Sequence, residues 1–204
     1  MAQLVVGAFV TLDGVMQGPG GPDEDRDGGF EHGGWNVTYW DDAMSGAIVE
    51  QSAKGDAILL GRKTYDIWAA HWPNVSGDPI SDRLNSIPKY VTSRTMDTAE
   101  WKNTTVLKGE AAQTVARLKA ELDGRIMVNG SGELLQTLIE HDLIDEYYVW
   151  TFPLLLGTGK RLFGSGTVPA ALKLTETTTS TTGVTISTYV RSGDIAYGSF
   201  QLEQ

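Results

Sequence analysis

Glycines, hydroxyls and cationic side chains directly follow an apolar run in the stretch ILLGRKTYDIW. The run ends at Gly61, and Arg62, Lys63 and Thr64 come next. A strand that turns into a helix at such a glycine presents free backbone N–H groups at the positive end of the helix. Because two cations and a hydroxyl lie beside those groups, we predict that these four residues contact a phosphate.

The stretch IMVNGSGEL repeats this construction. A second apolar run ends in Gly130, Ser131 and Gly132, and Glu133 and Leu134 follow. Glycines allow the backbone to approach a diphosphate closely, and two such turns predict a nucleotide that spans neighbouring strand ends. Taken alone, each turn is more typical of an ordinary strand-to-helix junction, since neither matches a complete nucleotide-binding fingerprint.

A third phosphate-binding candidate follows the run KYVT. Ser93 and Thr95 flank Arg94 there, and a guanidinium between two hydroxyls suits a terminal phosphomonoester such as the 2′-phosphate of NADP. The alternative is a surface arginine in a turn, which is where most arginines lie.

Three acidic residues are candidates for proton transfer. Asp41 and Asp42 are adjacent in TYWDDAM, and Asp13 ends the first apolar run in TLDG. Two close carboxylates raise the pKa of one of them, which suits general acid catalysis. The competing interpretations are structural: acids in a first turn stabilise the helix dipole, and an Asp before a Gly forms turns.

Residues 13–38 contain eight glycines and no periodic segment. A loop of this length inside a compact domain is usually functional or disordered, so we predict a lid over the ligand. The aromatic residues in and just after this segment suit a surface that covers a planar ligand. A tolerated surface insertion is the alternative.

Composition limits the possible functions. The chain has 204 residues, 41% of them hydrophobic, and a formal net charge of -10, with no cysteine and three scattered histidines. A single domain, 1–204, is expected, and the charge argues against nucleic-acid binding. Disulfides and thiolate ligands are excluded, and no metal site is expected. The N-terminus lacks a basic leader, and no apolar run is long enough to cross a bilayer, so we expect a cytoplasmic protein.

Strand and helix patterns alternate along the chain. Apolar runs predict strands at 3–10, 56–60, 88–92, 104–107, 125–128 and 146–152. Helical periodicity predicts helices at 39–53, 63–71, 111–122 and 132–141. Two Thr-rich runs, 172–179 and 184–190, predict an antiparallel hairpin at one edge of a mostly parallel sheet. The fold class is therefore a layered α/β domain.

The order of these motifs, with LVVGAFVTLDG at the start and PLLLGTGKRLF near the end, resembles the dihydrofolate reductase-like family. That family includes the C-terminal reductase domain of the bacterial riboflavin-biosynthesis deaminase/reductase. The resemblance implies a three-layer fold, with a central mixed sheet flanked by helices, and NADPH bound across the strand ends. It assigns 61–64 and 130–134 to the diphosphate and nicotinamide side, and Ser93 and Arg94 to the 2′-phosphate. Relatives often pair, so a homodimer is expected.

The chain also departs from these relatives. It has no zinc deaminase domain and no folate-specific signature. The sequence predicts an NADPH-dependent reductase of a small pterin- or pyrimidine-type heterocycle, with the substrate pocket formed by Met16, Trp35, Trp40 and Phe152. Two alternatives remain open: a non-catalytic NADP(H)- or ligand-binding protein of the same fold, and a scaffold that acts through its acidic surface.

Overall fold

One sheet with parallel and antiparallel strands forms the middle of the molecule. In the computed structural model, which describes residues 1–165 and 167–200, the strand order is β4-β3-β2-β5-β1-β6-β8-β7. The strands are β1 (Gln3–Thr11), β2 (Ala57–Gly61), β3 (Lys89–Thr92), β4 (Thr104–Leu107), β5 (Arg125–Asn129), β6 (Glu146–Phe152), β7 (Leu172–Thr179) and β8 (Thr185–Arg191). Neighbours run parallel from β4 to β6, and β8 is antiparallel to β6 and β7. The predicted fold class and its C-terminal hairpin are confirmed.

Helices cover both faces of the parallel part of the sheet. They are α1 (Asp42–Ala53), α2 (Arg62–His71), α3 (Pro79–Ser86), α4 (Ala111–Glu121) and α5 (Gly132–Glu140). Side chains alternate along a strand, so neighbouring residues of β2 enter different cores. Leu59 packs in one core with Val115 of α4 and Leu135 of α5, whereas Leu60 packs in another with Leu84 of α3. The result is a helix–sheet–helix arrangement.

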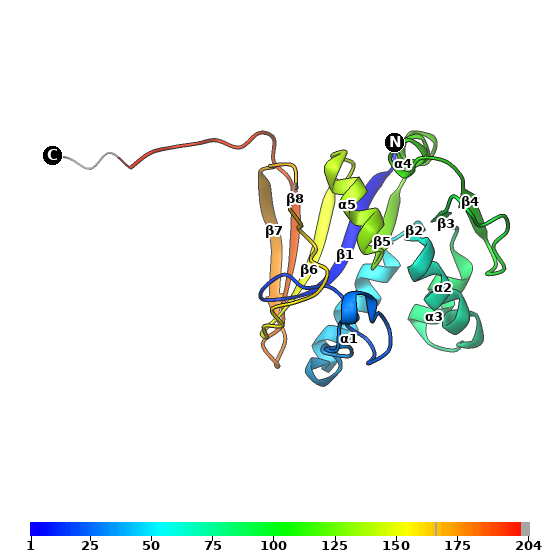
Figure 1. Ribbon diagram of the computed structural model, residues 1–204, viewed down its shortest axis with the longest axis horizontal. Coiled ribbons are helices and arrows are strands. Elements are labelled where there is room, and N and C mark those ends of the chain that lie inside the picture. The colour runs from blue at the N-terminus through cyan, green and yellow to red at the C-terminus, as the bar shows by residue number, and fades with distance from the viewer. Residues whose placement is uncertain (166, 201–204) are drawn as a thin grey trace.

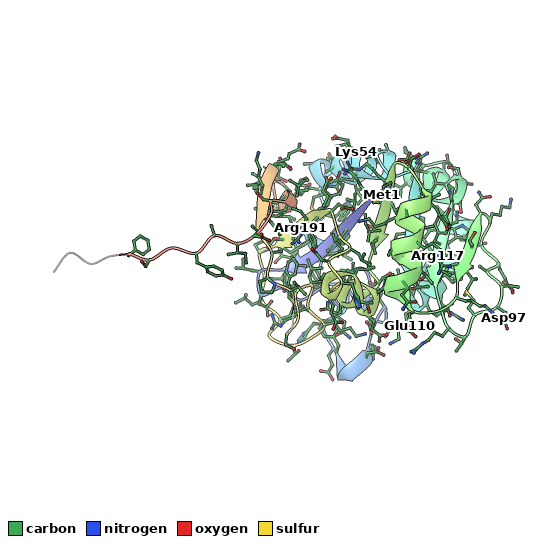
Figure 2. All side chains as sticks on the ribbon, turned by 90° about the horizontal axis from the view of Figure 1, so that it is seen from above. Met1, Lys54, Asp97, Glu110, Arg117 and Arg191 are labelled. Carbon is green, nitrogen blue, oxygen red and sulfur yellow. The ribbon has the colours of Figure 1, made fainter. Side chains whose placement is uncertain are left out.

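The two edges of the sheet are far apart in Figure 1, with the β7–β8 hairpin at one and the β3–β4 pair at the other. Residues 192–200 leave the hairpin and run away from the rest of the molecule. In Figure 2, side chains fill the space between the helices and the sheet. None of the helices in the described ranges has the length and apolar character that crossing a bilayer requires.

Helix α1 begins three residues later than predicted. Trp40 and Asp41 have extended backbone angles, and the Asp41 carboxylate accepts a hydrogen bond of 2.8 Å from the backbone N–H of Met44. An aspartate in this role fixes the first residue of a helix, here Asp42. The start predicted at Tyr39 is therefore wrong: a short 3-10 turn, Val37–Tyr39, precedes the helix instead.

Helix α3 (Pro79–Ser86) was not predicted from the sequence. Asp78 caps its first turn and Pro79 is its first residue, and both are ordinary helix-start signals. Its last turn is held by Lys89, whose buried ammonium donates to the backbone carbonyl of Leu84 at 2.8 Å. The helix is short, and its end depends on this contact with β3, so the sequence pattern alone was too weak to indicate it.

Candidate functional site

A cleft of about 1560 Å³ lies along the carboxyl-terminal parts of β1, β2 and β5. Pockets for one small ligand usually measure roughly 300–1000 Å³, so this cleft has room for two ligands side by side. One region, the turn half, is lined by the segments that follow β2, β3, β4 and β5, at 61–64, 92–95, 109–113 and 129–134. The other, the aromatic half, is lined by Phe9, Trp40, Ile48, Gln51, Ser52 and Trp150.

Two junctions of the turn half are tied together by Ser131. The Ser131 hydroxyl accepts from the backbone N–H of Gly61 at 2.9 Å and donates to the carbonyl of Asn129 at 3.0 Å. Its backbone N–H donates to the Thr64 hydroxyl at 2.9 Å. Because β2 and β5 are neighbouring parallel strands, the two turns that follow them meet at the carboxyl ends of these strands.

The amino-terminal ends of α2 and α5 are open toward an anion. Neither Gly61 nor Ser131, which precede these helices, caps the first turn with a side-chain hydrogen bond. The free N–H groups of both first turns therefore remain available at positive helix ends. Gly130 has a φ of 56° and a Cβ there would lie 3.2 Å from the Thr64 side chain, so glycine is needed for this approach.

The cations of the turn half differ in their partners. The Arg62 guanidinium Nε contacts both carboxylate oxygens of Asp66 at 2.8 Å. Lys63 pairs with Asp27 of residues 13–38, the glycine-rich loop, and lies 3.7 Å from the Glu133 carboxylate. Arg94 is exposed and has no hydrogen-bond or ion-pair partner among the described residues. Arg94 is thus the cation that a phosphate could contact without displacing a carboxylate.

The glycine-rich loop is anchored over the turn half by ion pairs. Lys160 contacts Asp25 at 2.6 Å and Asp27 at 2.9 Å, and Asp27 also pairs with Lys63. The Lys63 hydrogen bond, with Lys160 second, lowers the pKa of Asp27 to about 2, and Asp27 in turn raises the pKa of Lys63. Asp27 and Lys63 are therefore both ionised at neutral pH. An anion that binds Lys63 must therefore compete with Asp27.

Three aromatic rings form the aromatic half. Trp40 and Trp150 are nearly parallel, with ring centroids 5.9 Å apart and an interplanar angle of 8°. Phe9 meets both rings edge-on, at 5.8 Å and 5.2 Å. Trp150 is buried, whereas Trp40 is 39% exposed, so Trp40 offers its surface to a ligand. The Trp150 indole Nε1–H donates to the Gln51 side-chain oxygen at 3.1 Å.

Residues 2–186 match the family model described as the RibD C-terminal domain. The chain belongs to the RibD C-terminal domain family. This is a family of NAD(P)H-dependent reductases. An uncharacterised Bacillus subtilis protein, YyaP, is 28% identical over 196 residues, which cover 94% of this chain and 96% of that protein.

Solved structures share the fold of this RibD C-terminal domain. A putative riboflavin biosynthesis protein from Shewanella sp. PV-4 has a TM-score of 0.66 and 24% identity, covering 95% of this chain and all of that one. Dihydrofolate reductase from Enterococcus faecalis, complexed with NADP(H), has a TM-score of 0.60 and 12% identity, covering 94% and 97%. At these identities the likeness shows the fold, which agrees with the resemblance seen in the sequence.

Every residue predicted to bind the cofactor lines the cleft of this RibD C-terminal domain. These residues are Gly61, Arg62, Lys63, Thr64, Ser93, Arg94, Gly130, Ser131, Gly132, Glu133 and Leu134. The roles of two of them are partly structural. The hydroxyl of Ser93 accepts from the backbone N–H of Met96 at 3.0 Å, and the hydroxyl of Ser131 joins the two turns. Cofactor contact at these positions stays a prediction.

The three acids predicted to be catalytic lie outside the cleft lining. Asp41 caps α1 and accepts from the backbone and hydroxyl of Thr181 at 2.8 and 2.7 Å, and Asp42 is exposed in the first turn. Asp13 accepts from the Thr11 hydroxyl and from the backbone N–H of Gly157, which lower its pKa to about 2. The Asp41 and Asp13 carboxylates thus hold a helix end and a loop end, and a catalytic role at the three positions stays a prediction.

Two of the four residues predicted to form the substrate pocket line the cleft, and two do not. Met16 and Trp40 line the cleft, but Trp35 and Phe152 do not. Trp35 and Phe152 are 8% and 0% exposed, and their rings pack edge-on at 5.1 Å. Trp35 also donates its indole N–H to the carbonyl of Gln17 at 2.7 Å. These two rings therefore belong to the hydrophobic core beside the cleft, and Trp35 also holds the glycine-rich loop in place through its bond to Gln17.

Sequence reasoning missed most of the aromatic half. Phe9 and Trp150 were interpreted as strand residues, and Gln51 as part of a helix. One signal was present: Ile48, Gln51 and Ser52 have the spacing that places residues on one helix face. The sequence analysis also did not assign the junction before α4, residues 109–113, to the cleft. No cluster of three or more His, Asp or Glu side chains that could hold a metal occurs in the described ranges.

Proposed function

We propose that this protein binds NADPH in the turn half and transfers a hydride to a small pterin- or pyrimidine-type heterocycle in the aromatic half. The observation that carries the proposal is the meeting of two uncapped helix ends beside an arginine that has no partner among the described residues. Backbone N–H groups suit a diphosphate, and Arg94 suits a phosphomonoester. Membership of the RibD C-terminal domain family supports NADP(H) as the cofactor.

Each part of the chain has a role in this proposal. Bound NADPH would supply the hydride. Thr64 and Ser131 hold the two turns in register, so that the N–H groups of α2 and α5 point at the same diphosphate. Met16 and the anchored loop exclude water from the cleft. Trp40 and Trp150 orient the acceptor ring in the adjoining half.

A non-catalytic NADP(H)-binding protein is the second candidate, and one observation favours it. Asp13, Asp41 and Asp42 lie outside the cleft lining, so none of them is placed to give a proton to the acceptor. A reductase with this site would take the proton from water. The two candidates differ in one measurement: only the reductase oxidises NADPH in the presence of a reducible heterocycle.

The decisive experiment compares NADPH with NADH by calorimetric titration. Arg94→Ala should weaken NADPH binding by roughly 10- to 150-fold, the value of about 1.5–3 kcal/mol for one charge-assisted contact, and leave NADH unaffected. Arg117→Ala is the matched control, because Arg117 is an exposed arginine of α4 that Figure 2 shows on the surface. If neither nucleotide binds the wild type, the proposed function is wrong.

We also infer that the protein forms a homodimer through the segment 150–163. Leu155 and Phe163 in this segment are 69% and 46% exposed, whereas Trp150 belongs to the core. Burial of two large apolar side chains from each copy would favour association. Light scattering should give the mass of a dimer for the wild type and of a monomer for Leu155→Asp. A monomeric wild type would contradict this inference.

A further inference from the structure

The aromatic half contains one polar side chain whose orientation is fixed by its neighbours. The residues that β1, α1, α3 and β6 contribute to the cleft carry no charge. The charged lining residues come instead from the glycine-rich loop and its partner Lys160, from α2, from α5 and from the junctions around Arg94 and Glu110. A ligand in the aromatic half is therefore recognised by uncharged groups, of which Gln51 is the largest polar one.

Trp150 determines which end of the Gln51 amide faces the ligand. An indole N–H is a donor only, so the atom that it contacts at 3.1 Å must be the carbonyl oxygen of Gln51. Trp150 is 1% exposed and packs against Phe9 and Trp40, so it holds this geometry. The amide NH2 of Gln51 has no acceptor among the described residues. Gln51 thus presents two N–H donors from a half-buried position that lines the cleft.

We infer that Gln51 is a specificity-determining residue that donates to an exocyclic carbonyl oxygen of a neutral, planar heterocycle lying against Trp40. This inference rests on the proposed function, since it names the class of acceptor for the same site. Two facts support it. The N–H donors of Gln51 repel the amino groups of a diamino ring, which are donors too. A cationic ring would lose its hydration in this half without gaining a carboxylate partner, which costs binding free energy. A ring with oxygens at those positions satisfies the amide and loses little on burial.

A matched pair of ligands and a matched pair of variants test this inference. Pteridine-2,4-dione presents oxygens where 2,4-diaminopteridine presents amino groups, and the two rings have the same shape. Calorimetry on the wild type should show tighter binding of the dione. Gln51→Glu should reverse the preference by at least about tenfold in the ratio of dissociation constants, because a carboxylate accepts from amino groups and cannot donate. The carboxylate can still accept from Trp150.

Gln3→Glu is the control, because Gln3 is exposed at the start of β1 and the change adds the same charge away from the cleft. A preference that is unchanged in Gln51→Glu, or reversed equally in Gln3→Glu, overturns the inference, as does a wild type that binds neither ring. If Gln51→Glu does not fold, Gln51→Met replaces it. That variant should weaken the dione by about fivefold to tenfold with no gain for the diamine.

The outcome is separable from that of the NADPH titration. Ring binding is measured without nucleotide, and Gln51 belongs to the aromatic half rather than to the turn half. A reversed preference in a protein that does not bind NADPH would retain the role of Gln51 and reject the reductase. NADPH binding with an unchanged ring preference would retain the cofactor site and reject the role of Gln51.

Discussion

The turn half and the aromatic half of the cleft are built from different parts of the chain. In the turn half, the backbone of short junctions provides the binding groups, and Ser131 joins two of these junctions at hydrogen-bond distance. In the aromatic half, Trp40 meets side chains that come from β1, α1 and β6. Backbone groups are placed by the local fold of each junction. Side chains from distant segments meet only when the whole core is packed.

The two halves also differ in charge. The turn half contains cations, and two of them are neutralised by Asp66 and Asp27. The aromatic half has no charged residue from the strands and helix that form it. An anionic group is therefore matched to one half and an uncharged ring to the other. The comparison teaches that the two halves suit different groups of the proposed reactants, an anionic group beside the cations and free backbone N–H groups of one half and a neutral ring in the other.

Gly130→Val should separate the two halves with the largest effect. A β-branched residue at the φ of 56° costs on the order of 1–3 kcal/mol, and its Cβ would lie 3.2 Å from Thr64. We expect NADPH affinity to fall by about 100-fold and pteridine-2,4-dione affinity to be unchanged, as measured by calorimetry.

The control for this change is Gly157→Val. Gly157 has a φ of 76° and lies outside the cleft lining, and a Cβ at this position would meet no atom within 4 Å, so its backbone strain is similar and no clash is added. This variant should lose stability but keep NADPH affinity. Wild-type NADPH binding in a folded Gly130→Val protein would show that the junction at 130–134 is not a binding element.

Trp40→Ala should act on the aromatic half with an intermediate effect. Trp40 is the most exposed ring of the three, and removal of an aromatic contact and its buried area costs about 1–3 kcal/mol. Pteridine-2,4-dione affinity should fall by roughly 10-fold or more, with NADPH affinity within about twofold of the wild type. Trp40→Phe keeps a ring and should restore most of the affinity. A parallel loss of NADPH binding would contradict the division into two halves.

Asp27→Asn should have the smallest effect, and in the opposite direction. Removal of the carboxylate leaves Lys63 with the more distant Glu133 at 3.7 Å as its remaining acidic partner, and an exposed ion pair contributes little, so NADPH should bind up to about fivefold more tightly. Asp23→Asn is the matched control, because Asp23 pairs with Arg26 in the same loop. Equal gains in both variants would indicate a general charge effect rather than competition at Lys63.

The pH dependence of this competition follows from the pKa of Asp27. Its value falls from 3.8 to about 2 on folding. Because the folded value is the lower one, the stabilisation by the pair is complete above pH 3.8 and is lost as the pH falls toward 2. The ratio of wild-type to Asp27→Asn affinity should therefore be constant around neutral pH. A ratio that changes between about pH 6 and 8 would assign the competition to another group.

Much of the fold could be predicted because its signals are local. The apolar runs at 125–128 and 146–152 correspond to β5 and β6, and the Thr-rich pair to β7 and β8. Helix α3 escaped prediction because it is short and its end depends on Lys89. The start of α1 was misplaced because the cap is Asp41 rather than the aromatic residues before it.

The sequence by itself determined the two junctions that form the turn half. Gly61 and Gly130 end apolar runs directly before helical patterns, and those patterns dictate where backbone N–H groups are free. Tertiary structure alone decided which acids face the cleft and which way the Gln51 amide points. The roles of Asp13 and Asp41 are undetermined until their partners at Gly157 and Thr181 are known. The physical reason is the sequence separation of the interacting residues. A turn is set by adjacent residues, whereas a side chain's role depends on distant partners that packing brings together.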